Sequence, residues 1–151
     1  VSGELKALED QLASKKNEVA AAQKALDEAN TNKSNYLNQV STLSQEAQAA
    51  KNNQAAAEKA YTDAQANYDA NPTEENKAAL DAAQKDMQEK QQAASSISTE
   101  FETENTKYAE KVKSLDKAIS DAKDELDNLK KEQEALEIQV SDKTTELNKF
   151  N

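Results

Sequence analysis

The chain has 151 residues and a formal net charge of −10, and it contains neither cysteine nor histidine. Without cysteine there is no disulfide or thiolate chemistry, and without histidine the commonest general base and metal ligand is missing. All 19 basic residues are lysine, and an acidic chain without arginine is a poor candidate for binding nucleic acid. Only 36% of the residues are hydrophobic and 32% are charged, which indicates long helices or coiled coil rather than a compact globular domain.

Disorder is the competing interpretation, because the mean hydropathy is low and the net charge is high. A heptad repeat in the first half of the chain argues against it, since apolar residues recur there at alternating steps of three and four. The repeat predicts a helix over residues 4–70, about 100 Å long at 1.5 Å per residue. Residues 30–35 are poor helix formers, and the sequence leaves open whether the helix breaks there. The predicted core positions are Leu5, Leu8, Leu12, Lys15, Val19, Ala22, Leu26, Ala29, Lys33, Tyr36, Val40, Leu43, Ala47, Ala50, Gln54, Ala57, Tyr61, Ala64 and Tyr68.

The only proline, Pro72, predicts a turn at about residues 70–73. The residue before a proline avoids the α region, so the first helix is expected to end just before it. Asn71 is the predicted N-cap of the second helix, with Pro72 at its first position, and Thr73 is the alternative cap. The second helix is therefore expected over residues 72–150.

The second helix repeats the heptad pattern as far as Tyr108. The step from Glu104 to Tyr108 is four residues, so the heptad pattern would next take a step of three, to Lys111. The next large apolar residue is instead Val112, a further four residues along. Such a stutter locally unwinds a left-handed supercoil. We therefore expect the helix or its core layers to depart from regularity within residues 105–113. The predicted core positions are Leu80, Ala83, Met87, Lys90, Ala94, Ile97, Phe101, Glu104, Tyr108, Val112, Leu115, Ile119, Ala122, Leu126, Leu129, Gln133, Leu136, Val140, Lys143, Leu147 and Phe150.

The two helices match best when they fold back on each other at residue 72. Large core residues then mostly face small ones, as close packing requires. The fold class is therefore all-α, a long antiparallel two-helix coiled-coil hairpin that comprises residues 1–151. Facing pairs include Ala57 with Met87 and Tyr36 with Tyr108, and beyond the stutter, where the match shifts by four residues, Lys15 with Gln133.

Several core positions are polar, which allows two interpretations. One is a binding site, and the other is specification of the register between the helices, which polar core residues perform in coiled coils. Register is favoured, because a two-helix core is half open and long side chains can extend from it to water. The positions are Lys15, Lys33, Gln54, Lys90, Glu104 and Gln133.

No catalytic, cofactor-binding or metal-binding residue is expected, and the chain is not expected to be an enzyme. Glu100, Glu102 and Glu104 resemble paired carboxylates, but acid–base chemistry requires a pocket and calcium requires converging loop oxygens. No apolar run is long enough to insert into a membrane. Residues 29–57 form a nearly uncharged stretch rich in Asn, Gln, Ser and Thr, which is either a partner contact or a solvated face.

Three segments resemble the helical regions of Gram-positive cell-surface proteins: Ala57–Tyr61, Tyr68–Leu80 and Lys123–Leu126. The similar groups are M-like proteins, pneumococcal surface protein A-like proteins and the surface-exclusion proteins of conjugative plasmids. The shared features are a composition rich in Ala, Lys, Glu, Gln and Asn, the lack of cysteine and the proline-capped helix joint. The resemblance implies an extracellular stalk or adhesin region, attached to the cell wall through regions absent here, with a role in virulence or conjugation. It transfers no functional residue.

The sequence thus predicts a rigid extended stalk or spacer of a bacterial surface protein that supports adhesion or cell–cell contact. One alternative is a module that captures a host or bacterial protein on a helical face. Another is a regulatory coiled coil for a neighbouring hydrolase domain. The chain is expected to be a monomeric hairpin or a weak dimer without cofactors. Because the repeat extends to both ends, we expect a fragment of a larger surface protein.

Overall fold

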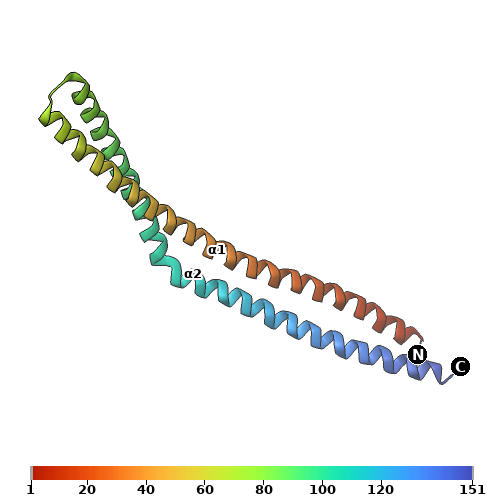
Figure 1. The fold of residues 1–151 in the computed structure, drawn as a ribbon. Helices are drawn as coiled ribbons and strands as arrows, with labels where there is room; N and C mark the ends of the chain where they lie inside the picture. Colours follow the sequence, from red (N-terminus) through yellow and green to blue (C-terminus); the bar gives the residue numbers. More distant parts are fainter. Residues whose placement is uncertain (1, 151) are drawn as a thin grey trace. The chain divides into compact units, whose positions relative to one another are not determined.

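The computed structural model describes residues 2–150 and contains two helices, α1 (Ser2–Ala70) and α2 (Glu74–Asn148) (Figure 1). They have 69 and 75 residues and are joined by a short turn. Within the described residues there is no strand, and the two helices pack against each other in antiparallel directions. The chain is therefore an all-α helical hairpin, which confirms the predicted fold class.

Both helices are continuous through the places where a break was considered. Residues 30–35 and residues 105–113 are α-helical throughout. Weak local propensity does not break α1, because half-buried Lys33 and Tyr36 anchor this stretch to the core. Tertiary packing of this kind contributes more to helix stability than propensity does.

Burial follows the predicted heptads. Every predicted core position of α1 is buried or half-buried, and so is every predicted position of α2 except one. The exception is Phe150, whose side chain is 75% exposed. Its predicted place in the core is wrong because α2 ends at Asn148 and the last backbone bonds tighten, with the Phe150 amide donating to the Leu147 carbonyl at 3.1 Å. The side chain thereby leaves the helical phase.

The stutter is visible in the core layers of α2. Tyr108 and Val112 are half-buried while Lys111 is exposed, so the core continues with Val112, as the stutter predicts. The helix absorbs the four extra residues without losing its α-helical backbone. The stutter is therefore seen in the layers of the core, while residues 105–113 remain α-helical.

The core is thin. The five buried apolar residues are Ala22, Ala47, Ala57, Ala94 and Leu126, which are 3–8% exposed. Two helices cover each other along a single stripe, so larger core side chains remain half-buried. Alanines at facing positions leave room for the large residues opposite them.

The chain divides into two compact units. Unit 1 comprises Val1–Asn35 and Glu110–Asn151, and within its described part the ion pair of Glu4 with Lys143 at 2.6 Å joins the first turn of α1 to the end of α2. Unit 2 comprises Tyr36–Ala109 and includes the turn. The unit boundary in α2 falls within the stutter.

Each unit has the helix register that was predicted for it. In unit 2 the rings of Tyr36 and Tyr108 stack with centroids 6.0 Å apart, so these residues face each other. In unit 1 the Lys15 ammonium lies 2.7 Å from Glu132, the residue before the predicted facing residue Gln133. The two halves of the hairpin therefore pair in registers that differ by about four residues, as expected for a stutter in one helix only.

Thr73 caps α2. Its hydroxyl accepts a hydrogen bond from the Asn76 backbone amide at 3.1 Å, and its carbonyl accepts the first helical bond, from the Lys77 amide, at 2.9 Å. This is the geometry of an N-cap residue and its third successor. The prediction of Asn71 as the cap is wrong, and the alternative, Thr73, is correct. As a result α2 begins at Glu74 rather than at residue 72.

Asn71 instead closes α1. Its amide donates to the Asn67 carbonyl at 3.0 Å, and its own carbonyl accepts from the Thr73 amide at 2.8 Å in a tight turn around Pro72. The side-chain amide of Asn76 also donates to the Asn71 carbonyl, at 2.7 Å. An N-cap carbonyl must accept the first bond of its helix, and this carbonyl is already used twice. Asn76 thereby ties the end of α1 to the first turn of α2.

Replacement of the cap tests this arrangement. Thr73→Ala should lower the free energy of unfolding by about 1 kcal/mol, because the Asn76 amide loses its acceptor. Asn71→Ala is the matched control, since no hydrogen bond within residues 2–150 uses the Asn71 side chain, and it should change stability by less than about 0.5 kcal/mol. Urea unfolding followed by circular dichroism measures both, and the reverse order would show that Asn71 is the cap.

The register of unit 2 predicts a specific cross-link. Ala57 and Met87 are core positions at equal distances from Pro72, as are the stacked Tyr36 and Tyr108. In the otherwise cysteine-free chain, the double variant Ala57→Cys and Met87→Cys should form a disulfide within one chain under mild oxidation. Non-reducing electrophoresis checks this, and a bridge found only between chains would show two helices running on as a parallel dimer.

Candidate functional site

The six polar core positions do not converge on one site. Each of them is half-buried, and they are spread along both helices and both units. They fall into two groups, according to whether the side chain bonds across to the other helix or to its own helix. The first group holds the helices together, and the second satisfies its own polar atoms locally.

Lys15 and Lys33 reach across unit 1. The Lys15 ammonium contacts Glu132 of α2 at 2.7 Å and Glu18 of α1 at 2.8 Å, and Lys33 contacts Asp116 of α2 at 2.6 Å. The hydrogen bonds to Glu132 and then Glu18 raise the pKa of the Lys15 ammonium above its ordinary value. Both lysines keep their stems in the core and their charges at its edge, where an acid of the opposite helix lies.

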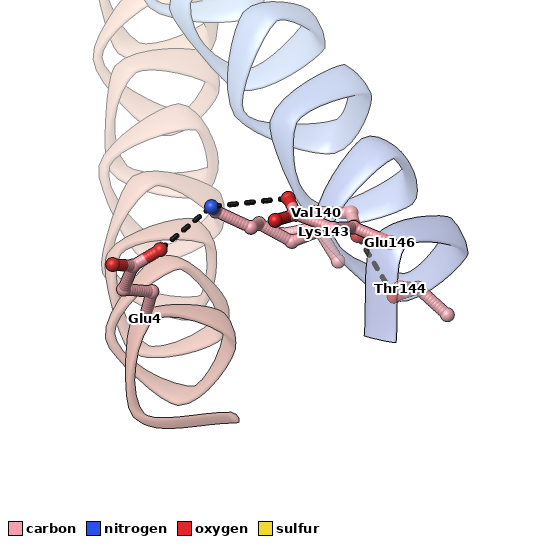
Figure 2. A network of polar contacts seen from close by, with 5 residues as sticks. All are labelled: Glu4, Val140, Lys143, Thr144 and Glu146. Atoms are coloured by element: carbon pink, nitrogen blue, oxygen red, sulfur yellow. Dashed lines mark hydrogen bonds and ion pairs between the residues drawn. The ribbon is translucent and has the colours of Figure 1, made fainter. Parts of the chain in front are cut away.

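Lys143, a predicted core position outside the six polar ones named above, makes the same kind of contact. Figure 2 shows its side chain extending from α2 to Glu4 of α1, with the two charged groups 2.6 Å apart, and Glu146 lies 3.2 Å from the same ammonium. The hydrogen bond from Lys143 holds the pKa of the Glu4 carboxyl below its ordinary value. The signal that identifies Lys143 is that it is a lysine at a core position of the heptad pattern, as Lys15 and Lys33 are.

The remaining amide and lysine positions bond within their own helix. Gln54 donates to Glu58 at 3.0 Å and Gln133 donates to Glu137 at 2.8 Å. Lys90 pairs with Asp86, also on α2, at 3.2 Å. These side chains therefore do not point together into a common ligand site.

Glu104 belongs to an aromatic contact in unit 2. Its carboxylate accepts a hydrogen bond from the Tyr36 hydroxyl at 2.8 Å, and the Tyr36 ring stacks on Tyr108. Partial burial and, next, this hydrogen bond raise the pKa of Tyr36 to about 12. Tyr36 therefore remains a protonated donor at neutral pH and fixes Glu104 as its acceptor.

The acid-rich segment around Phe101 does not form a catalytic or metal-binding arrangement. Glu100 and Glu102 are exposed on α2, whereas Glu104 is half-buried against Tyr36. Within residues 2–150 no group of three or more acidic side chains is placed so that it could hold a metal ion. In the same part of the chain, no helix is long and apolar enough to cross a membrane.

The open grooves between the helices in the described residues include one in each unit. The first, in unit 2, has a volume of about 430 Å³ and carries no charge; we call it the neutral groove. The second, in unit 1, has a volume of about 380 Å³; we call it the charged groove. The neutral groove is lined by Leu37, Val40, Ser41, Ser44, Gln45, Phe101, Asn105 and Tyr108. The charged groove is lined by Asp10, Gln11, Ser14, Lys15, Glu18 and Leu136.

Comparison of the chain with protein-family models, curated proteins and solved structures found no match. The interpretation therefore rests on the geometry of the hairpin. Polar core residues that bond across the helices or along them are what register specification requires, and the neutral groove is the feature that this role leaves unexplained.

The register interpretation predicts the effect of removing a core charge. Lys15→Met keeps the apolar stem and removes the ammonium, and it should leave the free energy of unfolding unchanged or raise it by up to about 1 kcal/mol, because polar core residues specify register at a cost in stability. Lys16→Met, at the exposed neighbour, is the control and should have an effect below about 0.5 kcal/mol. Denaturant unfolding measures both. A loss of more than about 1 kcal/mol in Lys15→Met would show that the ion pairs are a main source of stability.

Proposed function

We propose that this hairpin is a rigid spacer, the stalk of a bacterial surface protein, and that it has no catalytic activity. The observation that carries the proposal is the continuous heptad core, which is followed by burial from Leu5 to Leu147 while both helices remain unbroken. The polar core positions bond either across the helices or within their own helix, and they do not converge on a ligand site. The sequence pattern is therefore accounted for by the formation and pairing of two long helices.

The spacer function follows from the length of the helices. At 1.5 Å per residue, the 69 residues of α1 give a length along the helix axis of about 100 Å. A flexible linker of the same number of residues would have a root-mean-square end-to-end distance of only about 45 Å. Helical pairing therefore keeps the chain within each unit extended where a flexible linker would coil up, and it does so without a specific surface.

The two ends of the described chain also suit a spacer carried within a larger protein. Glu4 in the first turn of α1 and Lys143 near the end of α2 form an ion pair, so the two ends of the hairpin lie side by side in unit 1. A host protein could carry the hairpin as an insertion without a large change in its own fold.

The proposed location is the bacterial cell surface, with attachment to the cell wall through other regions of the parent protein. The resemblance to helical regions of Gram-positive surface proteins, which includes the proline-containing helix joint, supports this location. Adhesion and cell–cell contact are the activities that such a spacer would support. The competing functions, capture of a partner protein and regulation of a hydrolase, depend on a specific surface instead of on length.

Shortening the hairpin separates these functions. Deletion of Ala47–Ala60 together with Gln84–Ile97 removes two matched heptads from each helix and leaves the neutral groove and the Tyr36–Glu104 contact in place. The shortened hairpin should fold with unchanged heptad phase, and each helix should be about 20 Å shorter. Cells that display the parent protein with this deletion should lose adhesion or cell–cell contact, measured by attachment assays.

The matched control is a full-length triple variant with exposed charges reversed: Glu9→Lys, Asp124→Lys and Lys130→Glu. It changes the surface and leaves the length intact, so it should retain adhesion. Normal adhesion by the shortened hairpin would contradict the spacer function. Loss of adhesion after a single exposed substitution, with helicity and length unchanged, would favour capture of a partner.

A further inference from the structure

The neutral groove differs in chemistry from the rest of the surface. None of its eight lining residues is charged, in a chain in which 32% of the residues are charged. Its α1 side is a stripe with helical spacing from Leu37 to Gln45, and Gln48 and Asn52 continue the stripe without charge. The groove therefore coincides with the uncharged stretch that stands out in the sequence.

The groove offers both apolar surface and hydrogen-bonding groups. Its apolar members are half-buried, so part of their surface is still in contact with water, whereas Ser41, Ser44, Gln45 and Asn105 are exposed. Covering the groove would remove further apolar surface from water, which favours association. The polar members would need partners that both donate and accept hydrogen bonds.

A second copy of the same chain meets these requirements. Hydroxyl and amide side chains are both donors and acceptors, so a surface made of them can pair with itself across a two-fold axis. A surface of like charges cannot, and with a net charge of −10 two copies repel each other over most of their length. In the charged groove, for example, Asp10 of one copy would approach Glu18 of the other.

We propose that two copies of the chain associate side by side through their neutral grooves. The two α1 helices run antiparallel across a two-fold axis near Ser41, the middle of the stripe, so that the two Ser41 side chains meet and Leu37 of each copy faces Gln45 of the other. The contact is short and therefore weak and reversible, at the lower end of protein–protein interfaces in size. Pairing goes beyond the spacer function, because it describes contact between neighbouring hairpins.

The test places charges at the axis. The whole described hairpin is studied by sedimentation equilibrium up to millimolar concentrations, as wild type, as Ser41→Lys and as Ser41→Glu. The wild type should self-associate, and each variant should dissociate with a constant at least about tenfold larger, because like charges meet at the axis. An equimolar mixture of the two variants should recover association, because opposite charges then meet.

Ser14→Lys in the charged groove is the matched control, and its dissociation constant should equal that of the wild type. Both lysine variants make the chain less acidic, so weakening in Ser41→Lys alone is a local effect and not one of net charge. Circular dichroism should show unchanged helicity, since residue 41 is exposed on a helix. A monomeric wild type at millimolar concentration, equal association by both lysine variants, or a mixture that stays monomeric would overturn the proposal. These measurements use the purified chain, so their result is independent of the adhesion assay.

Discussion

Two helices can cover each other along one stripe only, and this constraint determines most of the hairpin. The buried apolar residues are four alanines and Leu126, while the larger core side chains stay in partial contact with water. A lysine can occupy such a core, because its side chain is long enough to place the ammonium at the edge, next to water or an acid. The same half-open core leaves grooves beside the stripe.

The contacts that hold the two helices together differ between the two units. In unit 1, core lysines form ion pairs with acids of the opposite helix, at Lys15, Lys33 and Lys143. In unit 2, the contacts across the helices include the Tyr36–Tyr108 stack and the hydrogen bond of Gln91 to Glu58 at 3.2 Å. The acids of these pairs are exposed, so we expect the ion pairs to contribute little stability and to act mainly by selecting one register.

The periodicity of the sequence was enough to predict the helices, the turn and nearly every core position, because burial in a two-helix hairpin depends on phase alone. It could not decide between Asn71 and Thr73 as the cap, since that choice depends on which groups use the Asn71 carbonyl. Lys15 bonds Glu132 instead of the facing Gln133 because Glu132 offers a carboxylate, whereas Gln133 is neutral and donates to Glu137. The neutral groove required the structure, because its lining combines residues of both helices, although its lack of charge was visible in α1.

The excess of acidic residues is unevenly distributed over the surface of the hairpin. With 29 acidic and 19 basic residues, the chain has more acids than its lysines can neutralise. The excess keeps neighbouring hairpins apart over most of their surface, as like charges do. Where residues 37–45 carry no charge, that repulsion is weakest and half-buried apolar side chains lie open. The distribution of charge thus underlies the proposal of pairing: the acidic surface opposes contact between two copies, whereas the neutral groove offers apolar and hydrogen-bonding groups without that repulsion.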